Sequence, residues 1–227
     1  MNDIKRKNVK FIVCDVLYDE IKDRIPESWT TVNLEKRLHN NSKDLMNKLQ
    51  DEINRSQEFD LIVLGYALCG KGVEGLVSEK IDMVILKCDD CISILLGSVD
   101  EYKKQFKIEP GTYYVTREYL GEVDNIILEG FKDIRFKYDD STWKWVIGEM
   151  LKNYKRLAFI NTGNYPVDEY RKKAKASADE LNLRFEEVCG SNRLFDKILR
   201  SDWDEEFVKV KAGTKVTLDM FINLASS

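Results

Sequence analysis

The sequence has neither long hydrophobic runs nor a surplus of basic residues. Its longest apolar runs reach about six residues, far below the roughly 20 that span a bilayer, so we expect no membrane segment. The 36 Lys and Arg are outnumbered by 40 Asp and Glu, whereas binding to nucleic acid or an anionic membrane needs clustered positive charge. The polar first residues lack the apolar segment of a signal peptide. We therefore expect a cytoplasmic protein with neither a nucleic-acid nor a membrane partner.

Histidine occurs only once, at His39, and cysteine five times. An odd number of cysteines in a reducing compartment does not indicate a disulfide framework. Only one C-x-x-C pair is present, Cys88 with Cys91, so a zinc ribbon, which needs two such pairs, is excluded. The cysteines are therefore buried apolar residues, metal ligands or reactive thiols.

Short apolar segments alternate with segments of helical periodicity along the chain. Strands are predicted at residues 10–16, 60–65, 81–86, 110–116, 156–161, 183–188 and 206–210. Helices are predicted at 42–53, 91–96, 141–154, 168–181 and 192–200, the third of them capped by Ser141 or Thr142. This alternation favours parallel sheets with right-handed crossovers. A charged stretch at residues 121–140 separates two similar halves. The predicted fold is α/β, with two Rossmann-like lobes (1–120 and 121–227), mainly parallel sheets and a cleft between the lobes.

Each cysteine stands at or just after the end of a predicted strand: Cys14, Cys69, Cys88, Cys91 and Cys189. Ligands of open parallel sheets bind beyond the carboxyl ends of the strands, so we expect all five at the same functional edge. Burial in the core is the simpler interpretation of any single cysteine. Five cysteines at strand ends favour a thiol-rich site shared by at least two of them, which we place in the N-terminal lobe.

His39 lies in a predicted loop, where a lone histidine is usually solvated. Imidazole is nevertheless a common partner of thiolates in metal sites, and mixed Cys/His ligands suit zinc or iron. Four candidate metal ligands follow: Cys14, His39, Cys69 and Cys91. All four would form a closed, structural metal site, whereas three of them would leave one coordination position open for a substrate, as in a catalytic site. The two carboxylates between Cys88 and Cys91 disfavour a reactive thiolate, but a bound cation reverses that effect.

Residues 65–72 follow a predicted strand and contain G-x-x-x-x-G-K, but Gly72 replaces the Ser or Thr of a phosphate-binding loop. A nucleotide triphosphatase is therefore not favoured. Glycines here would still let the backbone approach a ligand closely. Strand tyrosines more often pack in a core, but Tyr66, Tyr113 and Tyr114 could line a cleft. The candidate cofactor contacts are Gly65, Tyr66, Gly70 and Tyr113.

Several motifs resemble a known family: Leu38-His39-Asn40, the Tyr-x-x-Cys-Gly of residues 66–70, the Asp-Cys-Ile…Leu-Gly-Ser of residues 90–98, residues 111–114 and residues 189–191. Over nearly the whole chain the sequence is similar to domain-of-unknown-function family 1638. Lys87 and Asp89 stand where Arg and His are usual. The family occurs in anaerobic bacteria and methanogens and often accompanies corrinoid-dependent methyltransferases. The resemblance implies one-carbon metabolism, a corrinoid cofactor, a methyltransferase or corrinoid-protein partner, and Cys14, His39, Cys69 and Cys91 as site residues.

Three functions remain open from the sequence. The first is a metal-thiolate protein that holds zinc or iron and acts on a small molecule, with Cys91 as the catalytic residue and metal-dependent methyl transfer as the implied reaction. The second is a non-catalytic cofactor-binding or accessory module for a methyltransferase system. The third is a metal-free cysteine nucleophile, Cys91, activated at a helix N-terminus.

Overall fold

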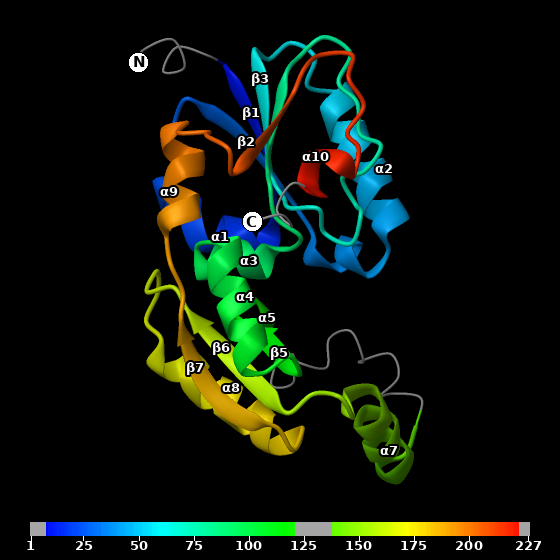
Figure 1. The fold of residues 1–227 in the computed structure, drawn as a ribbon, viewed down its shortest axis with the longest axis vertical. Coiled ribbons are helices and arrows are strands. Elements are labelled where there is room, and N and C mark those ends of the chain that lie inside the picture. The colour runs from blue at the N-terminus through cyan, green and yellow to red at the C-terminus, as the bar shows by residue number, and fades with distance from the viewer. Residues whose placement is uncertain (1–7, 121–137, 223–227) are drawn as a thin grey trace. The chain divides into compact units, whose positions relative to one another are not determined.

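The computed structural model describes residues 8–120 and 138–222 of the 227-residue chain, and these form two compact units. Unit 1 comprises the described parts of Met1–Ile94 and Asn192–Ser227, and unit 2 those of Leu95–Ser191. Within the described ranges, every helix is too short or too polar to cross a membrane. Most of the helices and strands are labelled in Figure 1.

Unit 1 is built on a five-stranded sheet with the order β2-β1-β3-β4-β8. Its strands are β1 (Val9–Cys14), β2 (Trp29–Leu34), β3 (Leu61–Gly65), β4 (Met83–Leu86) and β8 (Phe207–Val210). The first four are mutually parallel, and β8 runs antiparallel to β4. Nearly every residue of β1, β3 and β4 is buried. Such continuous apolar runs are typical of parallel strands that are covered on both faces.

Seven helical elements accompany this sheet: α1 (Asp15–Ile21), η2 (Lys22–Arg24), η3 (Lys36–Asn40), α2 (Ser42–Asn54), α3 (Cys91–Leu96), α9 (Arg193–Arg200) and α10 (Asp219–Ile222). Helix α3 runs across the boundary at Ile94. Helix α2 begins where Asn41 accepts a hydrogen bond from the backbone N–H of Lys43 (3.1 Å). Leu45, Leu49 and Ile53 repeat at helical spacing and are buried.

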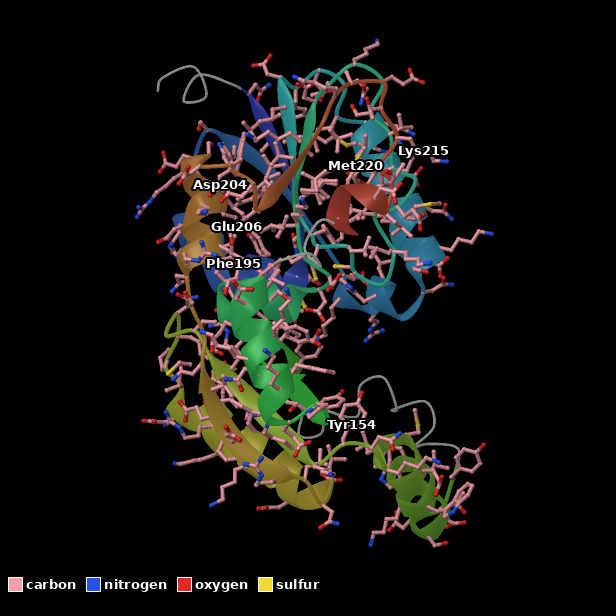
Figure 2. The ribbon with its side chains drawn as sticks, viewed as in Figure 1. Tyr154, Phe195, Asp204, Glu206, Lys215 and Met220 are labelled. Atoms are coloured by element: carbon pink, nitrogen blue, oxygen red, sulfur yellow. The ribbon has the colours of Figure 1, made fainter. Side chains whose placement is uncertain are left out.

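Helix α9 is joined to the segment before β8 by ion pairs. Arg193 contacts Glu206 (2.7 Å), and Lys197 contacts both Glu206 (2.6 Å) and Asp204. Asp204 and Glu206 are labelled in Figure 2. These basic side chains lower the pKa of both carboxyl groups. The contacts fix the turn between α9 and β8, and the pairing of β8 with β4 joins this part of the chain to the sheet of unit 1.

Unit 2 contains a parallel sheet in the order β5-β6-β7. Its elements are β5 (Thr112–Val115), β6 (Arg156–Asn161), β7 (Arg184–Cys189), α4 (Val99–Ile108), α5 (Arg117–Leu120), α7 (Asp140–Leu151) and α8 (Asp168–Glu180). The core includes Leu157 and Phe159 of β6 together with Trp143 of α7. Arg156 is fully buried, and its guanidinium donates to Thr112 Oγ1 (2.8 Å).

The predicted α/β fold is confirmed, and each predicted strand appears within a few residues of its expected bounds. The two units do not follow the expected division into 1–120 and 121–227. The reason is that β8 pairs with β4, which returns the last part of the chain to unit 1. Most of the expected boundary stretch, residues 121–137, lies outside the described residues. The expected cleft between lobes stays a prediction.

Two local details also differ from expectation. Strand β2 was not predicted, because it is an edge strand whose residues are mostly half-buried or exposed and it lacks a continuous apolar run. Helix α7 is capped by Asp139, whose carboxylate accepts from the N–H groups of Ser141 and Thr142 (both 2.9 Å). The predicted cap residues instead lie in the first turn of the helix.

Candidate functional site

Four cysteines of unit 1 follow the carboxyl ends of neighbouring parallel strands. Cys14 is the last residue of β1, Cys69 lies in the loop after β3, Cys88 follows β4, and Cys91 begins α3. Two backbone hydrogen bonds join the β3 and β4 loops: Leu68 N–H to Cys88 O and Cys69 N–H to Asp89 O, both 2.9 Å. The two loops are therefore held side by side at one edge of the sheet.

The loop after β3 makes a left-handed turn at the candidate site. Cys69, Gly70 and Lys71 have φ values of 47°, 62° and 75°, and the Gly72 N–H closes the turn on Cys69 O (3.1 Å). A left-handed conformation costs a non-glycine residue about 1–2 kcal/mol. A Cβ added at Gly70 would meet no atom within 4 Å. The turn thus leaves open space beside Gly70.

Gly65 is placed differently from Gly70. A Cβ at Gly65 would lie 2.6 Å from Val13 Cγ2 and 3.0 Å from Phe11 Cε2. Both side chains belong to β1, which is hydrogen-bonded to β3. The close packing of these two strands is sufficient to explain a glycine at this position.

A side-chain contact joins Cys14 and His39 at the candidate site. His39 Nε2 lies 3.2 Å from Cys14 Sγ, although the two residues come from β1 and η3. The imidazole ring also stacks on Tyr66, with centroids 5.9 Å apart and planes 19° apart. Burial lowers the pKa of His39 below its ordinary value of 6.5. The ring is therefore neutral at pH 7, the state in which histidine ligates a metal or acts as a base.

Tyr66 presents a buried hydroxyl group at this site. The residue is 1% exposed, and among the described residues its hydroxyl has no hydrogen-bond partner. Burial raises the pKa of Tyr66, and the nearby Cys14, Cys69 and Asp15 raise it further. The group is therefore a neutral phenol that can donate a hydrogen bond. Leaving such a group unpaired costs about 1–3 kcal/mol.

The thiols of Cys69 and Cys88 are uncharged at neutral pH. Burial is the main cause that raises the pKa of Cys69, followed by repulsion from Cys91, and from Cys14 and Cys88 more weakly. Burial likewise raises the pKa of Cys88, with repulsion from Asp90 and Cys91. These sulfur atoms therefore lie close enough for their charges to interact. A bound cation would remove this mutual repulsion and favour the thiolates.

The described residues do not bring every candidate together. No three His, Cys, Asp or Glu side chains within them are grouped so that they could hold a metal ion as they stand. Tyr113 belongs to unit 2, where its ring packs edge-on against Tyr154 (5.7 Å). Cys189 is exposed at the end of β7. The expectation of one edge for all five cysteines does not hold for Cys189, because β7 belongs to the second sheet.

The partnership of His39 with Tyr66 was missed by sequence reasoning. Tyr66 was expected to contact a cofactor, and His39 to lie in a loop. The stack requires the 3₁₀ turn of η3 to carry the imidazole ring over the end of β3. No local pattern indicates this turn, because its apolar content is low.

Comparison with known proteins gives one match. A protein-family model described as "Protein of unknown function (DUF1638)" matches residues 33–199. No curated protein and no solved structure matches the chain. The matched range contains His39, Cys69 and Cys91, whereas Cys14 precedes it.

Proposed function

The chain belongs to the DUF1638 family of proteins of unknown function, and from its own side chains we propose that it is a metal-thiolate protein. The proposed ligands of zinc or iron are Cys14, His39, Cys69 and Cys91. The observation that carries the proposal is the 3.2 Å contact of His39 Nε2 with Cys14 Sγ, in a site where Cys69 interacts electrostatically with both Cys91 and Cys14.

The protonation state of His39 suits metal ligation. Metal ligation requires neutral imidazole and deprotonated thiols, and burial already keeps His39 neutral. The raised pKa of Cys69 means that its thiolate forms only with a compensating positive charge. Metal binding should therefore release protons. It also requires the Cys69 and Cys91 sulfur atoms to move toward the Cys14–His39 pair, because the side chains are not grouped as ligands as they stand.

Tyr66 and Cys91 are the residues of the proposed site that could contact a bound small molecule. The unpartnered Tyr66 hydroxyl is available to a ligand that accepts a hydrogen bond. Cys91 is partly exposed at the start of α3, so we assign it the position nearest the substrate. A bound zinc ion would supply Lewis-acid activation of a substrate thiol or carbonyl group. The open backbone at Gly70 would border the same ligand.

Cobalt substitution tests the ligand set. Thiolate ligation of Co²⁺ produces charge-transfer absorption, which should appear in the wild-type protein and in Cys189→Ser, the matched control in unit 2. The same absorption should be weaker in Cys14→Ser and in Cys69→Ser, with circular dichroism confirming that each variant is folded. Absence of the band in folded wild-type protein, or an equal loss in Cys189→Ser, would refute the proposed set.

A metal-free cysteine nucleophile is the second candidate, and one observation favours it. The Cys14–His39 distance is within the range of nucleophile–base pairs, which points to Cys14 rather than Cys91. Cys14 is only 2% exposed, however, and a nucleophile must be reached by its substrate. Rapid alkylation of Cys14 by iodoacetamide at pH 7, prevented in His39→Gln, would replace the metal proposal with this one.

The biological setting remains a proposal of the same kind. A corrinoid cofactor, methyl transfer and a methyltransferase or corrinoid-protein partner rest on the family resemblance alone. An accessory module would bind the corrinoid equally well in wild type and Cys91→Ser, whereas a catalytic site would lose turnover in that variant. We also propose the cytoplasm as the location, because thiolate ligands persist in a reducing compartment.

A further inference from the structure

A basic surface pocket of about 550 Å³ lies in unit 1, apart from the residues assigned to the proposed metal. Three lysines from separate segments line it: Lys43 in the first turn of α2, Lys71 after β3, and Lys215 after β8. Its volume is within the range of small-molecule sites. The three lysines therefore converge on a space that is large enough for a ligand.

The backbone around the pocket is fixed by hydrogen bonds. The Gly75 N–H donates to Val216 O (2.9 Å), and the Val216 N–H donates to Leu76 O (2.8 Å). Gly75 has φ +93°, and a Cβ at this residue would lie 3.5 Å from Lys215 Cε. Lys215 is labelled in Figure 2. The pairing keeps Lys215 next to the loop that carries Lys71, so the pocket is a built feature rather than a chance gathering of lysines.

The charges of these lysines are not neutralised by the protein. None of the three forms an ion pair with another described residue, and the single acidic residue in the lining, Glu74, pairs with none of them. The chain as a whole has a net charge of −4. A local excess of positive charge in an acidic protein attracts anions to this place.

We infer that this pocket binds the phosphate group of a small molecule. Lysine is a common phosphate ligand that acts as a point charge, and three ammonium groups match a multiply charged anion better than a single carboxylate. Ser42 and Thr217, also in the lining, carry hydroxyl groups that can donate to phosphate oxygens. The inference is independent of the proposed metal, because none of these residues is among its proposed ligands.

Calorimetric titration with inorganic diphosphate at low ionic strength tests the inference. The wild-type protein should bind it saturably at one site. The double variant Lys43→Gln/Lys215→Gln should bind about tenfold more weakly, since each lost charge contact is worth up to about fivefold. Because both lysines are exposed, the variant should remain folded, which circular dichroism checks.

A matched control distinguishes the effect of the pocket lysines on diphosphate binding from the effect of net charge. Lys104→Gln/Lys152→Gln removes two exposed lysines of unit 2 and so changes the net charge equally. It should bind diphosphate within about twofold of wild type. No saturable binding up to about 10 mM, or equal weakening in the two double variants, would overturn the inference. Binding of succinate as tight as that of diphosphate would overturn the assignment to phosphate.

Discussion

Replacing Tyr66 by phenylalanine is expected to stabilise the ligand-free protein. The substitution removes a hydroxyl that is buried and has no partner among the described residues, while the ring that stacks on His39 remains. Leaving such a group unpaired costs about 1–3 kcal/mol. Part of the gain is lost to the small void that the missing oxygen leaves. The net effect should be about 1–2 kcal/mol of added stability, or roughly 2–8 °C in Tm for a chain of this size.

Tyr165 in unit 2 provides a matched control, for which the change in stability should have the opposite sign. Its hydroxyl accepts from the Arg117 N–H (3.3 Å) and donates to Ile160 O (3.5 Å). Tyr165→Phe should therefore lower the stability by about 1 kcal/mol. Calorimetry of the metal-free proteins measures both changes and separates the transitions of the two units if they unfold independently.

The Tyr66→Phe variant also tests whether the Tyr66 hydroxyl contacts a ligand or is simply left without a hydrogen bond. If a bound ligand accepts the Tyr66 hydrogen bond, Tyr66→Phe should weaken the binding of that ligand about fivefold, equivalent to about 1 kcal/mol. A Tyr66→Phe protein that is less stable than wild type in the absence of ligand would refute the reasoning, because the hydroxyl would then have had a partner.

Three further predictions concern packing, protonation and thiol reactivity. Gly65→Ala places a Cβ 2.6 Å from a β1 side chain and should lower the free energy of unfolding by about 1–3 kcal/mol. In Gly148→Ala the added Cβ meets no atom within 4 Å, so this variant should raise the free energy of unfolding by up to about 1 kcal/mol. Urea denaturation measures both changes, and equal effects would contradict the packing argument. His39 is the only histidine, so its imidazole proton NMR signal is unambiguous, and its titration midpoint should lie below pH 6.5. The unfolded state therefore binds the proton more tightly than the folded state does. The contribution of neutral His39 to stability is present above pH 6.5 and is lost as the pH falls through the folded-state pKa. A midpoint at or above 6.5 is the contrary result. Timed iodoacetamide labelling with mass spectrometry should modify the exposed Cys189 first and the buried Cys14 and Cys88 last, and the reverse order would contradict the assigned burial.

The strands could be predicted from the sequence where burial is continuous. β1, β3 and β4 are covered on both faces and appear as uninterrupted apolar runs. β8 was also predicted as a strand, but its antiparallel pairing with β4 depends on contacts across most of the chain. Local patterns carry no information on such pairing, which is why the division into units differed from expectation.

The candidate site was predictable only in part for the same reason. Cys14, Cys69 and Cys91 were identified because strand ends define the functional edge of a parallel sheet. The stack of His39 on Tyr66 depends on the path of η3 and left no periodic signal. The lysine pocket joins three segments whose approach follows from the Gly75–Val216 backbone pairing, and it was not anticipated at all.

Metal content is the most direct test of the central claim that the cysteines and His39 form a metal site. Protein purified without oxygen should contain about one zinc or iron per chain, both in the wild type and in Cys189→Ser. The folded double variant Cys14→Ala/His39→Ala should contain less than about 0.2 equivalent, since half of the ligands are removed. Wild-type protein that stays below about 0.2 equivalent after incubation with either metal would contradict the account.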